Sequence, residues 1–171
     1  MVAPNCGSLR VVLMDLEIFR VAVRGSFKRK ELEKVQEDVR KLSCLKSTPL
    51  HYAVLGGNIK IVRFLLAQGA VVDAENVFKE SPLHWACKLG KEEVILCLLS
   101  HQASPNVQDS EGNTPMHWAA EYDHEHVVRL LNLNGGRPSR TTRNEDRHTP
   151  LEVARLHSSR SVITGLRNVY Q

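Results

Sequence analysis

Three histidines, His51, His84 and His117, recur every 33 residues, and their type and spacing come closest in this chain to a catalytic or metal-binding pattern. An imidazole near neutral pH can act as a general acid, a general base or a metal ligand. Each histidine, however, follows a serine or threonine by three residues, so a local hydrogen bond at a helix start is sufficient to explain it. We therefore interpret the three histidines as structural residues.

The other histidines offer no better catalytic pattern. His124 and His126 are two residues apart, which places them on different faces of a helix, and no cysteine pair accompanies them. The sequence contains no glycine-rich phosphate loop, nucleophile elbow or paired-carboxylate motif. It therefore predicts a non-enzymatic protein with no catalytic residue, no cofactor and no metal site.

The cysteines indicate a reducing compartment. Cys6, Cys44, Cys87 and Cys97 lack the spacing of a metal or redox motif, and the last two fit small core residues better than disulfide partners. We therefore expect the protein in the cytoplasm, the nucleus or both. The basic cluster at residues 28–30 is more typical of a solvated helix face than of a nuclear import signal.

The three periodic histidines end a tetrapeptide that recurs through the chain. The first three copies are 33 residues apart, and a fourth, altered copy follows 35 residues after the third. The copies are Thr48-Pro49-Leu50-His51, Ser81-Pro82-Leu83-His84, Thr114-Pro115-Met116-His117 and Thr149-Pro150-Leu151-Glu152. A fixed period of this size is typical of units that bury their apolar faces only by stacking on one another.

Each repeat predicts two short helices. The serine or threonine caps the first helix, and the proline after it occupies the first helical position, where its missing N–H costs nothing. Gly57 and Gly90 end this helix in the first two repeats. A second helix follows with one wide apolar stripe, which in the first repeat consists of Ile61, Val62, Leu65 and Leu66.

A few positions depart from the period. In the third repeat Asp123 replaces the glycine that ends the first helix, and Asn132 interrupts the apolar stripe. Gly69 and Gly135 stand where a helix needs a left-handed terminator, and Gln102 replaces this glycine in the second repeat at a conformational cost. We therefore expect local strain in the middle repeat.

The last repeat has the features of an end cap. Glu152 replaces the histidine and predicts a capping box with Thr149, and the residues after it are more polar than their counterparts. The preceding segment, 134–147, contains a two-residue insertion, a Gly-Gly-Arg-Pro turn and four arginines, which predict an enlarged, mobile loop. We expect the stack to close at this repeat.

The pattern as a whole resembles the ankyrin repeat, whose signature combines Thr-Pro-Leu-His-x-Ala, a glycine, an Ile-Val-x-x-Leu-Leu helix and a Gly-Ala corner. The resemblance covers Ser47 to about Arg167 and implies an all-α ankyrin-repeat solenoid of stacked helix-turn-helix units with projecting loops. The expected repeat domain spans residues 47–171, with repeats near 48–80, 81–113 and 114–148 and a C-terminal capping repeat at 149–171.

The first 46 residues carry no tetrapeptide, and we expect residues 1–46 to be a helical segment that forms a degenerate N-terminal capping repeat. Within it, residues 9–23 fit one helix face and also contain short strand-like alternations. We favour a monomer. If residues 9–23 leave the apolar edge of the stack uncovered, a dimer becomes the alternative.

Composition and charge narrow the class of protein and the kind of partner. A chain with 42% hydrophobic and 25% charged residues is expected to fold, and no apolar run is long enough to span a membrane. Residues 1–46 and 137–171 each carry a net charge of +4, whereas residues 47–136 carry −4. This distribution favours a partner with a basic or mixed surface over the central repeats.

The basic ends leave an alternative function open. Arg137, Arg140, Arg143 and Arg147, together with the basic N-terminal segment, are a candidate site for nucleic acid or anionic lipid, with an affinity that falls steeply with salt. Both basic ends lack the interleaved aromatic residues that stack on bases, so the sequence disfavours nucleic acid.

The family resemblance implies that a protein partner binds at the loop tips and at the exposed ends of the first helices, which together line the concave side. At the tips these positions are Val77, Phe78, Glu80, Ser110, Glu111, Asn113, Glu145, Asp146 and His148. At the helix ends they are Leu55, Lys88, Leu89, Glu121 and Tyr122.

Three of these residues, Phe78, Leu89 and Tyr122, are candidate anchors because they are apolar or aromatic where stacking does not require it. For Phe78 the alternative is that the ring folds against its own loop. The candidate polar rim consists of Glu80, Lys88, Glu111 and Glu121.

Three other aromatic residues are expected to serve the stack itself. Tyr52, Trp85 and Trp118 occupy the variable position after the histidine, and we expect them to form a partly buried ladder between repeats. They are therefore poor targets for surface mutation.

The leading hypothesis is a non-enzymatic protein–protein interaction module that acts as an adaptor or a regulatory inhibitor through the concave face. Chains of this size resemble ankyrin-type inhibitors of cyclin-dependent kinases or of transcription factors. They equally resemble the targeting segment of a larger enzyme or channel. The sequence does not name the partner.

Overall fold

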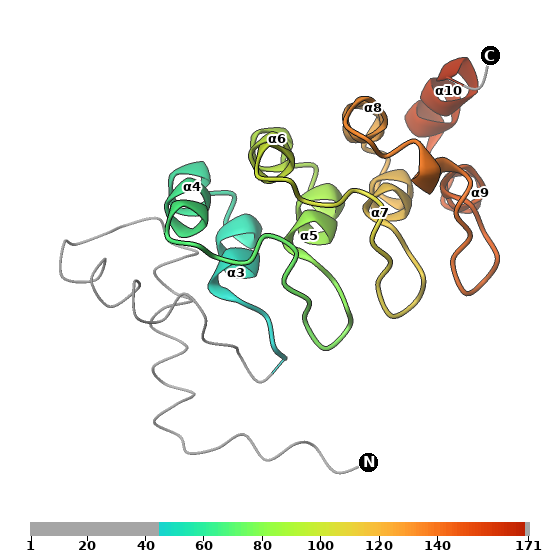
Figure 1. Cartoon of the computed structure of the whole chain (residues 1–171). Helices are drawn as coiled ribbons and strands as arrows, with labels where there is room; N and C mark the ends of the chain where they lie inside the picture. Colours follow the sequence, from blue (N-terminus) through green and yellow to red (C-terminus); the bar gives the residue numbers. More distant parts are fainter. Residues whose placement is uncertain (1–44, 170–171) are drawn as a thin grey trace, which may run out of the picture.

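The computed structural model describes residues 45–169, and over this range its regular elements are helices alone (Figure 1). The α-helices are α3 (Pro49–Leu55), α4 (Ile59–Ala67), α5 (Pro82–Lys88), α6 (Glu92–Ser100), α7 (Pro115–Glu121), α8 (Glu125–Leu133), α9 (Pro150–Leu156) and α10 (Arg160–Val169). A short 3-10 helix, η1 (Pro138–Arg140), lies between α8 and α9. The predicted all-α class is confirmed. The predicted N-terminal capping segment lies, except for its last two residues, outside the described residues.

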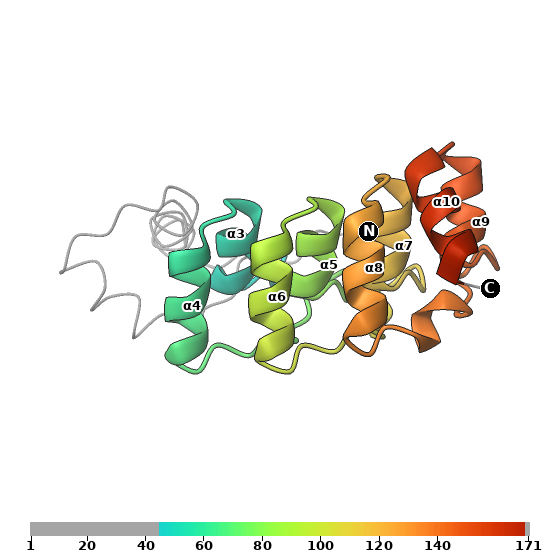
Figure 2. The same cartoon turned by 90° about the horizontal axis from the view of Figure 1, so that it is seen from above.

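The helices form two rows. Figure 1 shows α3, α5, α7 and α9 in one row and α4, α6, α8 and α10 in the other, with loops projecting beside the first row. Figure 2 shows the helix pairs side by side in chain order. Within each pair the two helices pack together, and each first helix packs on the first helix of the next pair. This is the stacked helix-turn-helix solenoid that the sequence predicts.

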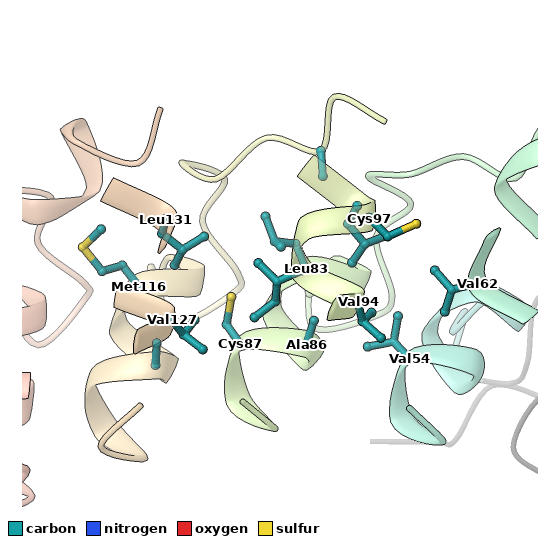
Figure 3. Packing of buried hydrophobic residues seen from close by; sticks show 14 of the residues in the cluster. Val54, Val62, Leu83, Ala86, Cys87, Val94, Cys97, Met116, Val127 and Leu131 are labelled. Atoms are coloured by element: carbon teal, nitrogen blue, oxygen red, sulfur yellow. The ribbon is translucent and has the colours of Figure 1, made fainter. Parts of the chain in front are cut away.

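A continuous apolar core holds the pairs together. The predicted stripe of α4 is buried, and the core continues through Val54, Val62, Leu83 and Val94 of the first two pairs (Figure 3). Burying one side chain of this size contributes roughly 1.5–3 kcal/mol. Because each pair buries its apolar face mainly against its neighbours, the pairs are stable only as a stack.

The chain takes left-handed backbone conformations at the predicted turns. Gly57 and Gly90, which follow the first helices, have φ of 67° and 63°, and Gly69 and Gly135, which follow the second helices, have φ of 83° and 92°. Gln102 takes the place of the second glycine with φ of 65°. A residue with a Cβ in this region costs about 1 kcal/mol, so the middle repeat carries the strain predicted for it.

The two departures of the third repeat are explained by contacts with later elements. Oδ1 of Asp123 accepts the backbone N–H of Val162 at 3.0 Å, and Oδ2 accepts the Ser161 hydroxyl at 3.1 Å, so this carboxylate caps the start of α10. Asn132 accepts a hydrogen bond from the Arg140 guanidinium at 3.4 Å. Both substitutions therefore connect the third repeat to the C-terminal part of the stack.

The insertion before the last repeat is anchored, and the prediction of a mobile loop is wrong for its centre. Ser139, within η1, is fully buried, and its hydroxyl lies 3.0 Å from the Pro105 carbonyl oxygen and 2.7 Å from Oδ1 of Asn106. These contacts reach back one whole repeat. The sequence pattern alone does not show them because they depend on how two loops pack in space.

Candidate functional site

The structural role predicted for the three periodic histidines is confirmed. In each repeat, Nδ1 of the histidine accepts the backbone N–H of the capping residue, at 3.1 Å for His51, 3.0 Å for His84 and 3.1 Å for His117. The capping hydroxyl oxygen lies 2.9 Å from the same nitrogen in all three repeats. Nδ1 is therefore the unprotonated nitrogen of each ring.

The opposite ring nitrogen joins one repeat to the next. Each Nε2–H donates to a backbone carbonyl in the following loop, and the pairs are His51 with Glu80 (3.0 Å), His84 with Asn113 (3.2 Å) and His117 with His148 (3.0 Å). Burial lowers the pKa of His51 to about 4 and also lowers the pKa of His84 and of His117. With both nitrogens engaged and the neutral form favoured, these rings have no free lone pair for catalysis or for a metal ion.

The fourth copy of the tetrapeptide ends this series. The Glu152 carboxylate accepts the backbone N–H of Thr149 at 2.7 Å and its hydroxyl at 2.8 Å, which confirms the predicted capping box. These bonds hold the pKa of Glu152 below its usual value. A carboxylate has no proton to donate to a further loop, so the link made by the earlier histidines stops at this repeat.

The loops are shaped by a second periodic residue, which the sequence analysis did not single out. Asn76, Asp109 and Asn144 each accept backbone N–H groups of their own loop through a side-chain oxygen, at distances of 2.8–3.0 Å. Their spacing of 33 and 35 residues is the signal that identifies them. They hold these three loops in similar conformations.

Successive loop tips are joined by backbone hydrogen bonds. The Ser110 N–H donates to the Phe78 carbonyl at 2.8 Å, and the Glu145 N–H donates to the Glu111 carbonyl at 2.9 Å. The tips therefore form one continuous edge. The predicted tip residues whose side chains are exposed on this edge are Val77, Phe78, Ser110, Glu111, Glu145 and Asp146.

Three predicted tip residues, Glu80, Asn113 and His148, do not belong to the exposed set. Asn113 is only 8% exposed, because its Oδ1 accepts from Asn144 at 2.9 Å and its backbone carbonyl receives the His84 ring. Glu80 and His148 occupy the same position of their loops and are half-buried. This position lies at the junction between repeats, so none of the three is among the exposed residues of the tips.

The first-helix ends and one loop enclose an open groove of about 540 Å³. It includes five of the predicted site residues and two that the sequence analysis did not assign to a site. The lining residues are Leu55, Glu80, Trp85, Lys88, Leu89, Tyr122 and His124. Neither Phe78 nor Glu121 lines it, and Glu121 is half-buried at the end of α7.

The groove presents apolar side chains that the stack leaves uncovered. Leu55, Leu89 and Tyr122 are 45%, 37% and 46% exposed. They come from the ends of three successive first helices, so the groove crosses three repeats. A concave surface with several partly exposed apolar side chains and a few polar groups is typical of a binding site.

The tryptophans are partly buried as predicted, and hydrogen bonds fasten them to the loops. Nε1 of Trp85 donates to the Glu80 carboxylate at 2.8 Å, and Nε1 of Trp118 donates to the Asp109 carboxylate at 2.8 Å. Trp85 also stands edge-on to Tyr52, with ring centres 5.9 Å apart. The ring of Trp85 nevertheless forms part of the groove surface, which the sequence analysis did not predict.

The ammonium group of Lys88, one of the groove residues, lies over aromatic rings. Nζ of Lys88 is 4.1 Å from the centre of the Trp118 ring and 5.8 Å from that of Tyr122. A cation over an aromatic face at this range is attracted by about 0.5–1 kcal/mol or more when partly desolvated. The aromatic residues thus fix the position of the Lys88 ammonium group.

Two of the four arginines considered for binding nucleic acid or anionic lipid make contacts with side chains of the same chain. Arg143 forms an ion pair with Glu152 at 3.1 Å, and Arg140 bonds to Asn132. In the described part of the chain, no three side chains of the metal-ligating types gather as a metal site would need. Over the same residues, no helix combines the length and the apolar character needed to cross a bilayer.

Comparison with known proteins agrees with the geometry. A family model described as ankyrin repeats (3 copies) matches residues 19–109 and 101–168, which together cover well over half of the chain. No curated protein matches the chain significantly.

Proposed function

We propose that this chain, which belongs to the ankyrin repeat family, binds a protein partner through the groove at the ends of α3, α5 and α7. Ankyrin repeat proteins are typically non-enzymatic modules of protein–protein interaction. The observation that carries the proposal is the exposure of Leu55, Leu89 and Tyr122 along this one groove. These side chains lie on a folded surface and leave between a third and a half of their area open to solvent.

The proposed role is that of an adaptor or a regulatory inhibitor, because binding needs no chemistry beyond the contact itself. In protein interfaces a few large side chains in a central pocket carry most of the affinity, each worth about 2 kcal/mol or more. Leu89 and Tyr122 are the proposed anchors. Phe78, at 52% exposure on the loop edge, is a proposed peripheral contact.

The proposed partner has a mixed or basic surface. The exposed loop tips carry the carboxylates of Glu111, Glu145 and Asp146, and complementary charge on the partner favours encounter and correct orientation. We further propose that the chain acts as a monomer in the cytosol or nucleus. The thiols of Cys87 and Cys97, free and buried, are compatible with a reducing compartment.

Affinity capture from a cell lysate tests the proposal. The intact chain is compared with the groove variant Leu55→Ala, Leu89→Ala, Tyr122→Ala, after circular dichroism has shown that the variant is folded. The matched control is Leu96→Ala, Leu133→Ala, which truncates two exposed leucines on the opposite row, in α6 and α8.

The proposal expects specific proteins to be retained by the intact chain and by the opposite-row control and to be lost from the groove variant. Retention of the same proteins by the groove variant would assign binding to another surface and contradict the proposal.

A further inference from the structure

The groove contains one ammonium group that has no carboxylate partner among residues 45–169. Lys88 is half-buried, and its Nζ faces the rings of Trp118 and Tyr122. The ion pairs formed over the same residues are Arg129 with Glu125 and Arg143 with Glu152, and the His126 ring lies 3.3 Å from the Glu92 carboxylate. Lys88 takes part in none of them.

The acidic residue that lines the groove is engaged by other donors. Oε2 of Glu80 accepts hydrogen bonds from Asn76 at 2.9 Å and from Trp85 at 2.8 Å. An aromatic face attracts a cation but satisfies its N–H donors only weakly. A partner that covers the groove removes water from Lys88, so these donors then need an acceptor supplied by the partner.

We infer that Lys88 determines specificity by pairing with an acidic side chain of the bound protein segment. This carboxylate lies beside the apolar side chain that occupies the groove next to Leu89 and Tyr122. The inference rests on the proposed function and adds the chemistry of the partner, which is a large apolar residue and an aspartate or glutamate close together in one segment.

The loop edge limits how acidic that segment can be. Glu111, Glu145 and Asp146 are exposed there, and Lys79 and Arg147 are exposed cations of the same edge. Like charges placed against these carboxylates are disfavoured. The bound segment therefore has one acidic residue at Lys88 and neutral or basic residues towards the tips that carry Glu111, Glu145 and Asp146.

A library of random linear peptides displayed on phage provides the probe. Peptides are selected on the full chain and counter-selected on the folded variant Leu89→Ala, Tyr122→Ala, so that those retained depend on the groove. Their affinities are then measured by fluorescence anisotropy. We expect the retained peptides to carry Asp or Glu beside a large apolar residue, and neutralising that acid to lower the affinity about tenfold.

Variants of Lys88 supply the reciprocal test. Lys88→Glu should weaken the same peptides more than about tenfold, whereas Lys88→Arg, which keeps the charge and the contact with Trp118, should stay within about twofold. The matched control is Lys60→Glu, the same charge change at an exposed position of α4 in the other row. A peptide whose acid is replaced by lysine should bind Lys88→Glu better than it binds the native chain.

The outcomes separate the inference from the proposed function. If groove-dependent peptides bind the native chain and Lys88→Glu equally well, the inference about Lys88 is overturned and the groove remains the binding site. If no peptide survives the counter-selection on Leu89→Ala, Tyr122→Ala, the inference and the proposed function both fail.

Discussion

The positions that join one repeat to the next hold the same residue type in three successive repeats, whereas the first-helix ends that line the groove hold different ones. At the junctions one position holds histidine in three successive repeats, and each ring makes the same two kinds of hydrogen bond. At the first-helix ends the corresponding positions hold Gly56, Leu89 and Tyr122. Residues that recur hold the stack together, whereas the residues at these three helix ends differ from one repeat to the next.

Variation alone does not identify a binding residue. Asp123 and Asn132 also depart from the repeat, yet both contact the C-terminal elements within the same chain. What distinguishes Leu89 and Tyr122 is that they line one groove, whereas Asp123 is also exposed but does not line it. Variation between repeats and a place in the groove together support the proposed site.

Removing a junction histidine should have the largest effect on stability. His84→Ala leaves the Ser81 N–H without its acceptor and the Asn113 carbonyl without its donor, and it opens a cavity in the stack. We expect the free energy of unfolding, measured with urea, to fall by about 3 kcal/mol. His126→Ala, at a half-exposed side chain, is the control and should change it by less than about 0.5 kcal/mol. Similar small losses for both would contradict the structural role of the junction.

Acidification should lower the free energy of unfolding through the junction histidines. Burial lowers the pKa of His51 from 6.5 to about 4, so below pH 6.5 the unfolded chain binds a proton that the folded chain excludes. The stability contribution is complete above pH 6.5 and is lost as the pH falls from there towards 4. For His51 alone, the free energy of unfolding should drop by about 2 kcal/mol between pH 7 and pH 5.

His84 and His117 should also lower the free energy of unfolding as the pH falls, because burial lowers their pKa values too. Chemical denaturation at a series of pH values measures the effect. A free energy of unfolding that stays constant from pH 7 to pH 5 is the result that this account cannot accommodate.

Alanine substitutions at two glycines with positive φ should separate the cost of backbone strain from the cost of a clash between repeats. A Cβ at Gly112 meets the backbone of the next loop, 3.0 Å from the Glu145 nitrogen and 3.1 Å from the Asn144 Cα, whereas a Cβ at Gly69 meets nothing within 4 Å. Both alanine variants suffer the left-handed conformation, so Gly112→Ala should lose about 1 kcal/mol more than Gly69→Ala. Thermal unfolding of the two variants gives the comparison. Equal losses would mean that the next loop moves away from the added methyl group at no cost in stability.

The smallest expected effect is a gain in stability. Gln102 holds a left-handed conformation with φ of 65° and is exposed, so Gln102→Gly removes strain without removing a buried contact. After the added freedom of the unfolded chain is subtracted, the free energy of unfolding should rise by about 0.5 kcal/mol. Destabilisation in urea titrations would show that the glutamine side chain has a role that its exposure does not reveal.

The sequence predicts the parts of the fold that depend on local pattern. The helices, the glycine turns, the capping box of Thr149 and Glu152, and the structural role of the histidines all follow from residue type and spacing. Each is fixed by contacts within a few residues, or by a period that the chain repeats. These predictions therefore needed no knowledge of how repeats pack.

Features that depend on contacts between repeats were predicted less well. Asn113 is buried because Asn144 of the next loop covers it, and the insertion is anchored because Ser139 reaches Asn106. Trp85 faces both the stack and the groove, so its aromatic character alone does not assign it to one of them. Contacts made one repeat away leave no local signal in the sequence.

The most direct test of the central claim is the free energy of unfolding of the groove variant Leu55→Ala, Leu89→Ala, Tyr122→Ala, measured with urea beside the native chain. The account predicts a loss of about 1 kcal/mol or less for each substitution, and less than about 3 kcal/mol for the three together, because these side chains are only partly buried. A loss of about 3 kcal/mol or more, as expected for His84→Ala alone, would contradict the separation of stacking residues from binding residues.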